Sequence, residues 1–252
     1  MLSFLENLNL GHGFRKYFRI DAALGESLHD EVYRIRHEVY CEDLGFEPVR
    51  DDRRETDAFD VHSLHCLLRT VGEPFRPVGC ARVVMTNPDD RDSLLPFERV
   101  CAEVLDRSII DPSRLPRERI AEVSRLAVRR AYRRRKGEER QEINDVSDED
   151  FGTAQQPRFP YIPVSLYMGA IAIAARQGVD TLFVLTEPRL AAHFARLGVR
   201  ITRIGGPIEH RGTRVPSMID VQDVIANMRT LMKPLWREVH AEVEKSFEAT
   251  PD

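Results

Sequence analysis

Several features are missing from this 252-residue sequence, and each absence narrows what the protein can be. No apolar run reaches about 18 residues, so we expect no membrane-spanning helix. The N-terminal apolar stretch is short and lacks the cationic start of a signal peptide, which predicts a cytoplasmic protein. The four cysteines are widely spaced without a C-x-x-C pair. This spacing argues against a zinc site and predicts reduced thiols that serve as small buried hydrophobic groups.

A strong charge imbalance is also missing. The sequence has 37 Lys and Arg against 41 Asp and Glu, and a net charge of −4. The overall charge therefore does not suggest a nucleic-acid partner. Hydrophobic residues make up 42% of the chain, which is typical of a globular protein. There are no internal repeats and no linker that would divide two cores, so we expect a single main domain.

The apolar periodicity predicts an alternation of strands and helices. Strands are expected at residues 17–22, 65–70, 78–85, 120–128, 180–186 and 199–204, with a hairpin over 208–221. Helices are expected at 24–40, 99–105, 163–178, 187–197 and 222–247, the last interrupted at Pro234. We therefore predict an α/β domain over 17–221 with a mixed, mostly antiparallel sheet and flanking helices. An N-terminal tail (1–16), a mobile acidic insertion (137–152) and a C-terminal helix (222–252) complete the expected organisation.

The stretch from Glu118 to Gly137 carries the densest chemistry. Glu122 and Arg125 stand three apart in the predicted strand, and six cations follow within residues 129–136. A strand that leads into a phosphate-binding turn has this order. A strand beside a solvated basic loop fits the spacing equally well.

Charged residues earlier in the chain also allow two interpretations, one functional and one structural. Arg36 borders the apolar stripe of its predicted helix, so it either pairs with a carboxylate or extends to solvent. Arg82 lies inside a predicted strand and needs a partner if it points inward. The loop over 41–60 ends in Glu55, Asp57 and Asp60, which form either part of a site or a solvated acidic turn.

These residues follow the order of a known family pattern. The matching positions are Arg36 and Tyr40, aromatic Phe46, Asp57 and Asp60, Arg82, Phe97, and the E-x-S-R run Glu122 to Arg125. In this order and spacing the chain resembles GNAT-fold acyltransferases, specifically acyl-homoserine-lactone synthases and N-acyl amino acid synthases. It is also similar to the acyltransferases associated with the exosortase/PEP-CTERM system. The sequence departs from the pattern at three positions: Phe46 replaces a usual Trp, Glu139 interrupts the donor-binding turn, and Phe194 replaces a catalytic Tyr.

The resemblance implies transfer of a fatty acyl group from a thioester to the amine of an amino acid or related small molecule. The donor would be acyl carrier protein or acyl-CoA, with no tightly bound cofactor and no metal. The implied amine site contains Arg36, Tyr40, Phe46, Asp57, Asp60, Arg82, Phe97, Ser124 and Arg125. The thioester donor would be held by Arg129, Arg133, Arg134, Arg135, Lys136 and Gly137. The reaction needs a base, for which Glu122 and Glu55 are candidates, and oxyanion donors, for which the backbone of Leu126 to Val128 is available.

The acyl chain needs an apolar slot, which the helix Val164 to Ala175 and Phe183 can line, although core packing explains most of these side chains. Two other functions stay open. One is an ordinary acetyl-CoA-dependent N-acetyltransferase, which Phe194 and Glu139 disfavour. The other is a non-enzymatic binding module that uses the basic 129–136 run, where a single aromatic, Tyr132, is available for base stacking.

Overall fold

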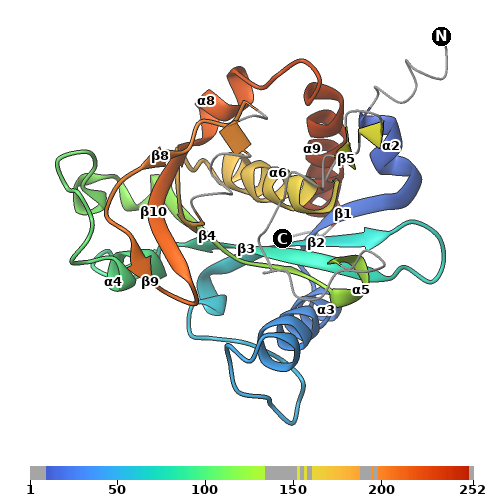
Figure 1. The fold of residues 1–252 in the computed structure, drawn as a ribbon, viewed down its shortest axis with the longest axis horizontal. Helices are drawn as coiled ribbons and strands as arrows, with labels where there is room; N and C mark the ends of the chain where they lie inside the picture. The colour runs from blue at the N-terminus through green and yellow to red at the C-terminus, as the bar shows by residue number, and fades with distance from the viewer. Residues whose placement is uncertain are drawn as a thin grey trace.

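A mixed eight-stranded sheet forms the centre of the protein (Figure 1). The computed structural model describes residues 10–133, 152–153, 156–157, 161–187, 194–195 and 198–249. The strand order is β1-β2-β3-β4-β7-β10-β8, and β9 pairs with β10. All described neighbours in this sheet are antiparallel except β4 and β7, which are parallel. The α/β class and the mostly antiparallel mixed sheet predicted from the sequence are confirmed.

The elements have the following bounds. The strands are β1 (Phe18–Ala23), β2 (Ser63–Thr70), β3 (Pro77–Met85), β4 (Ile120–Val128), β5 (Gly152–Thr153), β6 (Gln156–Pro157), β7 (Thr181–Thr186), β8 (Thr202–Arg203), β9 (Ile208–Glu209) and β10 (Thr213–Asp220). The α-helices are α2 (Leu10–Tyr17), α3 (Glu26–Arg36), α4 (Pro96–Val100), α5 (Arg130–Arg133), α6 (Tyr161–Arg176), α8 (Val221–Ala226) and α9 (Lys233–Glu248). A π-helix, η1 (His37–Asp43), continues α3, and 3-10 turns η2 (Asp60–His62), η3 (Pro112–Arg114) and η4 (Arg117–Arg119) lie in the connections.

Helices cover both faces of the sheet. The apolar helix α6 packs against β2 and β3 on one face, with α9 beside it against β1 and α2 against α9, while α3 packs against β3 on the other face (Figure 1). Ten of the residues of α6 are buried, which confirms the buried helix expected from its apolar sequence. All four cysteines are buried and form no disulfide bond, as their apolar surroundings predicted.

The ends of the chain differ from expectation. Residues 10–16, expected as part of a tail, belong to α2, because Leu10 and Phe14 bury their side chains in the main core. The single C-terminal helix is replaced by α8 and α9. Pro234 does not interrupt α9 but stands in its first turn, where a missing N–H costs nothing. None of the described helices combines the length and apolarity that crossing a bilayer requires.

Internal segments also differ. The helix expected over 24–40 ends at Arg36, and the π-helix η1 takes over. The short helix expected over 99–105 lies earlier, as α4. The acidic insertion falls outside the described residues except for its last residue, Gly152, which begins β5. Most of the helix expected over 187–197 also falls outside them.

Candidate active site

A cleft of about 280 Å³ opens where β4 and β7 separate. The two parallel strands pair from Ile120–Thr181 to Val123–Val184, and no later pair is described between them. Past this point β4 continues to Val128 beside β3, whereas β10, the other partner of β7, runs steeply across the direction of β4 (Figure 1). The separation leaves backbone groups of β4 facing the cleft instead of a neighbouring strand.

A bulge in β4 lies at this same point. The register between β3 and β4 shifts between Cys80 and Arg82, and Arg125 has a φ of 52°, in the left-handed region. Non-glycine residues in this region are uncommon and cluster at functional sites. The Tyr40 hydroxyl, from η1, donates a 2.8 Å hydrogen bond to the carbonyl of Leu126. The bulge is therefore fixed from the side of α3 and η1.

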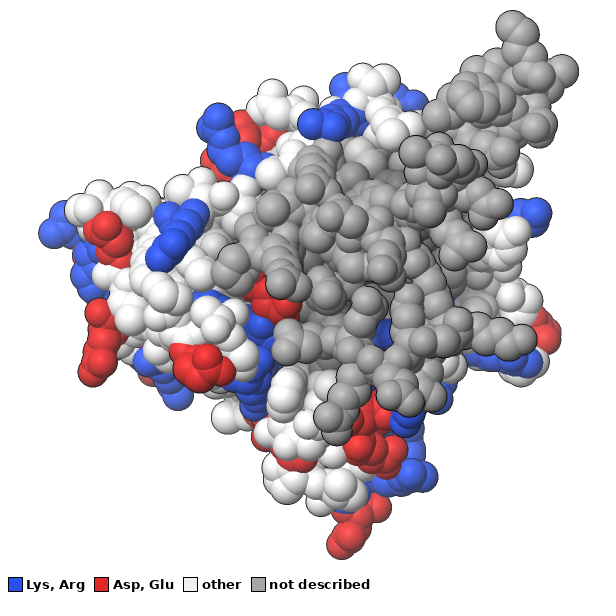
Figure 2. Space-filling model, in the orientation of Figure 1, with Lys and Arg blue, Asp and Glu red and all other residues white. Residues whose placement is uncertain are grey.

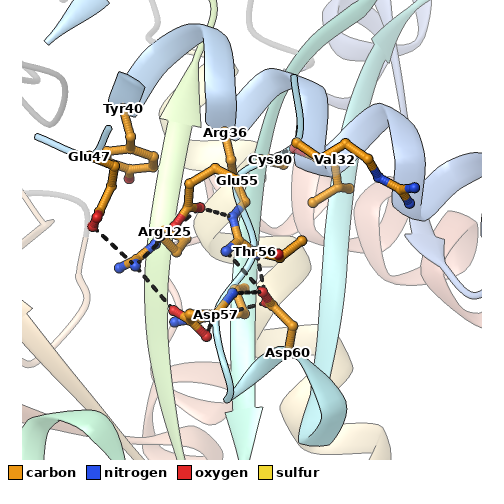
Figure 3. Close-up of polar contacts among 12 residues, drawn as sticks. Val32, Arg36, Tyr40, Glu47, Glu55, Thr56, Asp57, Asp60, Cys80 and Arg125 are labelled. Carbon is orange, nitrogen blue, oxygen red and sulfur yellow. Dashed lines mark hydrogen bonds and ion pairs between the residues drawn. The ribbon is translucent and has the colours of Figure 1, made fainter. Parts of the chain in front are cut away.

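An ion-pair network lies behind the bulge (Figure 3). Arg36 is fully buried at the end of α3. It donates to Glu55 Oε2 at 2.5 Å and makes two hydrogen bonds to Asp60, at 2.6 and 3.0 Å. Of the two alternatives for Arg36, the structure therefore has the paired one.

Two strand arginines complete this network. Arg82, on β3, points inward and donates to Asp57 at 2.7 Å and to Asp60 at 2.9 Å. Arg125 Nη2 lies 3.2 Å from Glu55 and 3.1 Å from Asp57. The loop that precedes β2 is thereby fixed to α3, β3 and β4.

The network keeps its carboxyl groups ionised. Burial acts to raise the pKa of Asp60, but the hydrogen bonds and charges of Arg36 outweigh burial and hold this pKa far below its usual value. Glu55 is in a similar position. Burial acts to raise the pKa of its carboxyl, but the charges and hydrogen bonds of Arg36 and Arg125 outweigh burial and lower this pKa. Glu55 is 1% exposed and already serves two arginines, so it cannot easily accept a proton from a substrate.

Glu122 has a different environment. Burial raises the pKa of its carboxyl to about 7, although Oε2 accepts a 2.7 Å hydrogen bond from the backbone N–H of Phe97. Glu122 lines the cleft on β4. A carboxyl group with a pKa near neutrality can take up and release a proton at physiological pH, which suits a general base.

The structure brings most, but not all, of the expected site residues to the cleft. Its lining includes Tyr40, Phe46, Asp57, Arg82, Glu122, Ser124, Arg125 and Leu126. The side chains of Arg36, Asp60 and Glu55 instead lie buried in the network behind it. Phe97 does not line the cleft but stacks on Phe183 at 4.3 Å between ring centroids, and Val128 is buried in the core beside Gly79.

The expected donor cations are only partly described. Arg129 pairs with Glu38 at 2.7 Å, and Arg133 pairs with Asp43, so both fix η1 to the end of β4. Arg134, Arg135, Lys136 and Gly137 lie outside the described residues, as does Glu139. On the face shown in Figure 2, described cations and anions are interspersed. The charges of Arg129 and Arg133 are thus each matched by a carboxylate of η1.

Several cleft residues had no signal in the sequence analysis. The C-terminal half contributes Tyr167 from α6 and His210, Arg211 and Arg214 from the β9–β10 hairpin. Their positions depend on how β7 and β10 cross the sheet, which no local spacing encodes. The alternation of the hairpin residues predicted the strands, but not that their turn would reach the cleft.

An apolar pocket adjoins the cleft. Tyr167 and Val184 line both, and Val164, Met168 and Ile171 of α6 line the apolar one. This pocket measures about 30 Å³ in the present conformation. Phe183, expected as part of an acyl slot, is not among its lining residues, because it packs with Phe97 on the other side of β7. Phe194 does line the pocket, and its ring lies 4.3 Å from that of Tyr167.

Comparisons with known proteins agree with this architecture. Residues 35–140, which include the end of α3 together with β2, β3 and β4, match the family model described as an acetyltransferase (GNAT) domain. A search of curated proteins gave no match.

Solved structures with a similar fold include synthases. TofI, in a ternary complex with an inhibitor and MTA, is 21% identical with a TM-score of 0.55, covering 83% of this chain and 95% of its own. BjaI, a CoA-dependent acyl-homoserine lactone synthase with SAM and isopentyl-CoA, is 20% identical with a TM-score of 0.56, covering 86% and 88%. FeeM, an N-acyl amino acid synthase from uncultured soil microbes, is 13% identical with a TM-score of 0.54, covering 86% and 97%.

The domain match covers the end of α3 and the strands that build the ion network and one wall of the cleft, and the solved structures share the fold over more than four fifths of the chain. Residues 35–140 therefore match a GNAT acetyltransferase domain, and this match supports an acyltransferase enzyme.

Proposed function

We propose that the protein is an N-acyltransferase that moves a fatty acyl group from an acyl thioester to the amine of an amino acid or related small molecule. One observation carries the proposal: the cleft that contains Glu122 adjoins an apolar pocket through Tyr167 and Val184. A charged cleft suits the amine, and an apolar pocket suits the acyl chain. The thioester carbonyl then lies where the two meet.

In the proposed reaction the amine nitrogen attacks the thioester carbonyl carbon. Glu122 takes the proton that the amine releases, because its raised pKa matches a base that works near neutral pH. The C–N bond forms, the C–S bond breaks, and the amide leaves with a thiolate, which takes a proton from solvent to become the free thiol while Glu122 returns its own proton to solvent. Glu55 is the weaker candidate for the base, since both of its oxygens are held by arginines.

The tetrahedral intermediate needs donors for its oxyanion. We assign this role to the backbone N–H of Leu126, which lies in the β4 bulge and lines the cleft. The hydrogen bond from Tyr40 to the Leu126 carbonyl fixes the next peptide unit, Leu126–Ala127, and so restrains the backbone on one side of this N–H. A single backbone donor of this kind contributes on the order of 3 kcal/mol to transition-state stabilisation.

The leaving thiolate needs a proton as well. Phe194, at the position of the usual tyrosine, has no hydroxyl to give. Tyr167 packs against Phe194 and lines both cavities, and burial raises the pKa of its hydroxyl, so the group stays protonated. We assign to Tyr167 the hydrogen bond that stabilises the departing sulfur.

The donor is acyl carrier protein or acyl-CoA. The test is release of free thiol by purified protein given acyl-CoA or acyl-carrier-protein thioesters of graded chain length, with the standard amino acids as acceptors. Mass spectrometry of the products identifies both halves of the amide. We expect thiol release that depends on the amine and disappears in Glu122→Gln. Thiol release no faster than without protein, for every donor and acceptor, would refute the proposal.

An acetyl-CoA-dependent N-acetyltransferase is the second candidate. It is favoured by the small size of the apolar pocket, about 30 Å³, which holds little more than a short acyl group without rearrangement. The same assay separates the two functions, because an acetyltransferase prefers acetyl-CoA to every longer donor. The three methionines of the pocket, Met168, Met228 and Met232, favour the longer chain, since methionine side chains rearrange readily.

A further inference from the structure

Two segments that lie far apart in the sequence meet at the cleft. Phe46 and Glu47 belong to the loop after η1, and Arg211 lies in the turn between β9 and β10. Arg211 donates a hydrogen bond to Glu47, and its guanidinium lies 5.7 Å from the ring centroid of Phe46. Phe46 and Arg211 both line the cleft, so these contacts join its two walls.

The backbone on each side of this contact is held in place. The Tyr40 carbonyl accepts hydrogen bonds from the backbone N–H groups of Phe46 and Glu47, at 2.8 and 3.1 Å. In the hairpin, Arg214, which is largely buried, donates to the Arg211 carbonyl at 3.0 Å. The side chains of Glu47 and Arg211 can therefore separate by rotation about their own bonds, without a change in the backbone of either segment.

Glu47 has a second cation within reach. Its Oε1 accepts from Nη2 of Arg211 and lies 3.7 Å from Nη2 of Arg125, on the β4 bulge (Figure 3). When Glu47 leaves Arg211, its charge therefore keeps a partner, and the Arg211 side chain, already 26% exposed, turns to solvent. Two discrete pairings of one carboxylate make a two-state element of the kind that switches between arrangements.

The contact between the two walls is weak enough to open often. An ion pair between side chains that reach solvent is screened by salt, and holding it costs side-chain entropy. A cation over an aromatic ring at such a site adds a small further attraction. Partly exposed side chains change rotamer much faster than a typical enzyme turns over. Opening and closing can thus take place many times within one catalytic cycle.

From these contacts we infer that the pair of Glu47 and Arg211 is a gate of the cleft. In the closed position the pair joins the loop after η1 to the hairpin turn over the β4 bulge. In the open position Glu47 pairs with Arg125 and Arg211 turns to solvent, which admits a molecule to the bulge. The inference goes beyond the proposed function, because the gate controls access to the cleft whichever thioester and amine react there.

The test measures access to the cleft with an introduced thiol. Ser124→Cys places a thiol on the wall of the cleft, and the four native cysteines are buried, so N-ethylmaleimide should label the new thiol selectively. Glu47→Gln and Arg211→Met, each combined with Ser124→Cys, should raise the labelling rate about 3-fold to 10-fold, the effect of losing a weak contact at the rim. With both changes together the rate should be no higher than with Arg211→Met, because the same contact is lost.

The two variants separate gating from a direct effect of charge on the thiol. Loss of the Glu47 carboxylate stabilises a nearby thiolate and speeds its labelling, whereas loss of the Arg211 guanidinium destabilises the thiolate and slows it. The gate instead requires both variants to label faster. Glu42→Gln, which removes a carboxylate of η1 that pairs with the exposed Arg53, is the matched control and should stay within about twofold of Ser124→Cys alone.

The inference is overturned if either Glu47→Gln or Arg211→Met labels no faster than Ser124→Cys alone, or if Glu42→Gln gives an equal rise. If Ser124→Cys does not fold, Leu126→Cys supplies a second thiol on the same strand of the cleft. Labelling involves no turnover. Absence of thiol release in the acyl-transfer assay would therefore refute the proposed function and leave the gate standing, whereas unchanged labelling would refute the gate alone.

Discussion

Arg36 and Asp60 make two parallel hydrogen bonds, from Nη1 to Oδ1 at 2.6 Å and from Nη2 to Oδ2 at 3.0 Å. Arg36 is fully buried, and Asp60 also serves Arg82. A buried pair of this kind is strongly destabilising to break, because the remaining charges stay in the protein without a partner. The pair therefore supports the loop that forms the cleft without facing the substrate itself.

Replacing Arg36 by methionine should lower the free energy of unfolding by about 3–5 kcal/mol, because it leaves Glu55 and Asp60 buried without their main cation. Urea unfolding followed by circular dichroism measures the change. The control is Arg34→Met, on the same helix, where the exposed pair with Asp30 contributes less than about 1 kcal/mol. Equal losses in the two variants would contradict the role assigned to the buried pair.

The activity should depend on pH with an acid limb near 7, since Glu122 must be ionised to take a proton and burial raises its pKa to about 7. Glu122→Gln keeps an oxygen for the Phe97 N–H and should lower kcat about 10²-fold to 10⁴-fold. Rates of thiol release from pH 5 to 9 measure both effects. An acid limb near pH 7 that persists in the variant would assign the base to another residue.

The same carboxyl group predicts a pH-dependent stability. Its pKa in the folded protein, about 7, lies above the ordinary value of 4.5, so the folded state binds more protons between these values. Stability gained from the protonated form is full below pH 4.5 and is lost as the pH rises through 7. Between pH 4.5 and 8 the wild type should therefore lose on the order of 3 kcal/mol of unfolding free energy that Glu122→Gln, which has no carboxyl to titrate, does not lose. The variant thus becomes more stable relative to wild type by this amount. A difference that does not change with pH would show that Glu122 has an ordinary pKa.

Removing the hydroxyl of Tyr167 should slow the reaction only for thioesters whose leaving thiolate is strongly basic. Tyr167→Phe keeps the contact with Phe194 and should lower kcat with an alkyl thioester about 10-fold to 100-fold. With a thiophenyl ester, whose leaving group needs no proton, the variant should match wild type. Tyr17→Phe, at an exposed tyrosine, is the control. The same loss with both esters would remove Tyr167 from the leaving-group role.

The apolar pocket should set the acyl length. Ile171→Phe adds bulk to its wall and should shift the preferred donor toward shorter chains, with kcat/KM for the longest donor falling at least about tenfold. Ile109→Phe, in an exposed loop, is the control. Competition among acyl-CoAs of graded length, analysed by mass spectrometry, gives the profile. An unchanged profile would place the acyl chain elsewhere.

Local patterns in the sequence were enough to predict much of the fold. The run Ile120 to Val128 and the apolar helix at 163–178 were recognisable because their periodicity follows burial, and both are where the pattern placed them. The end of α3 was not predictable, because the apolar spacing that marks an α-helix continues through the π-helix after Arg36. Likewise, Leu10 and Phe14 pack into a core that comes largely from distant parts of the chain, so α2 carried little local signal.

Some residues of the candidate site could likewise be predicted from the sequence, and others could not. Arg36, Arg82 and Arg125 could be marked as charged residues in or beside apolar elements, where burial demands partners. Which of them line the cleft could not be predicted, because depth within the network depends on how three strands and a loop pack. Arg211 had no apolar context at all, and its place at the cleft follows from the crossing of β10 over the sheet.

The two walls of the cleft come from separate parts of the chain: the ion network lies within residues 36–125, and the hairpin turn lies at 209–212. The buried ion pairs and the hairpin wall of the cleft are thus encoded in different stretches of sequence. A library that randomises residues 209–212, with Arg214 kept, gives up the pair of Arg211 with Glu47 but leaves the buried pairs of Arg36 and Arg82 intact. In such a library a change in activity need not be accompanied by loss of soluble expression, so the hairpin is the place to begin redesign.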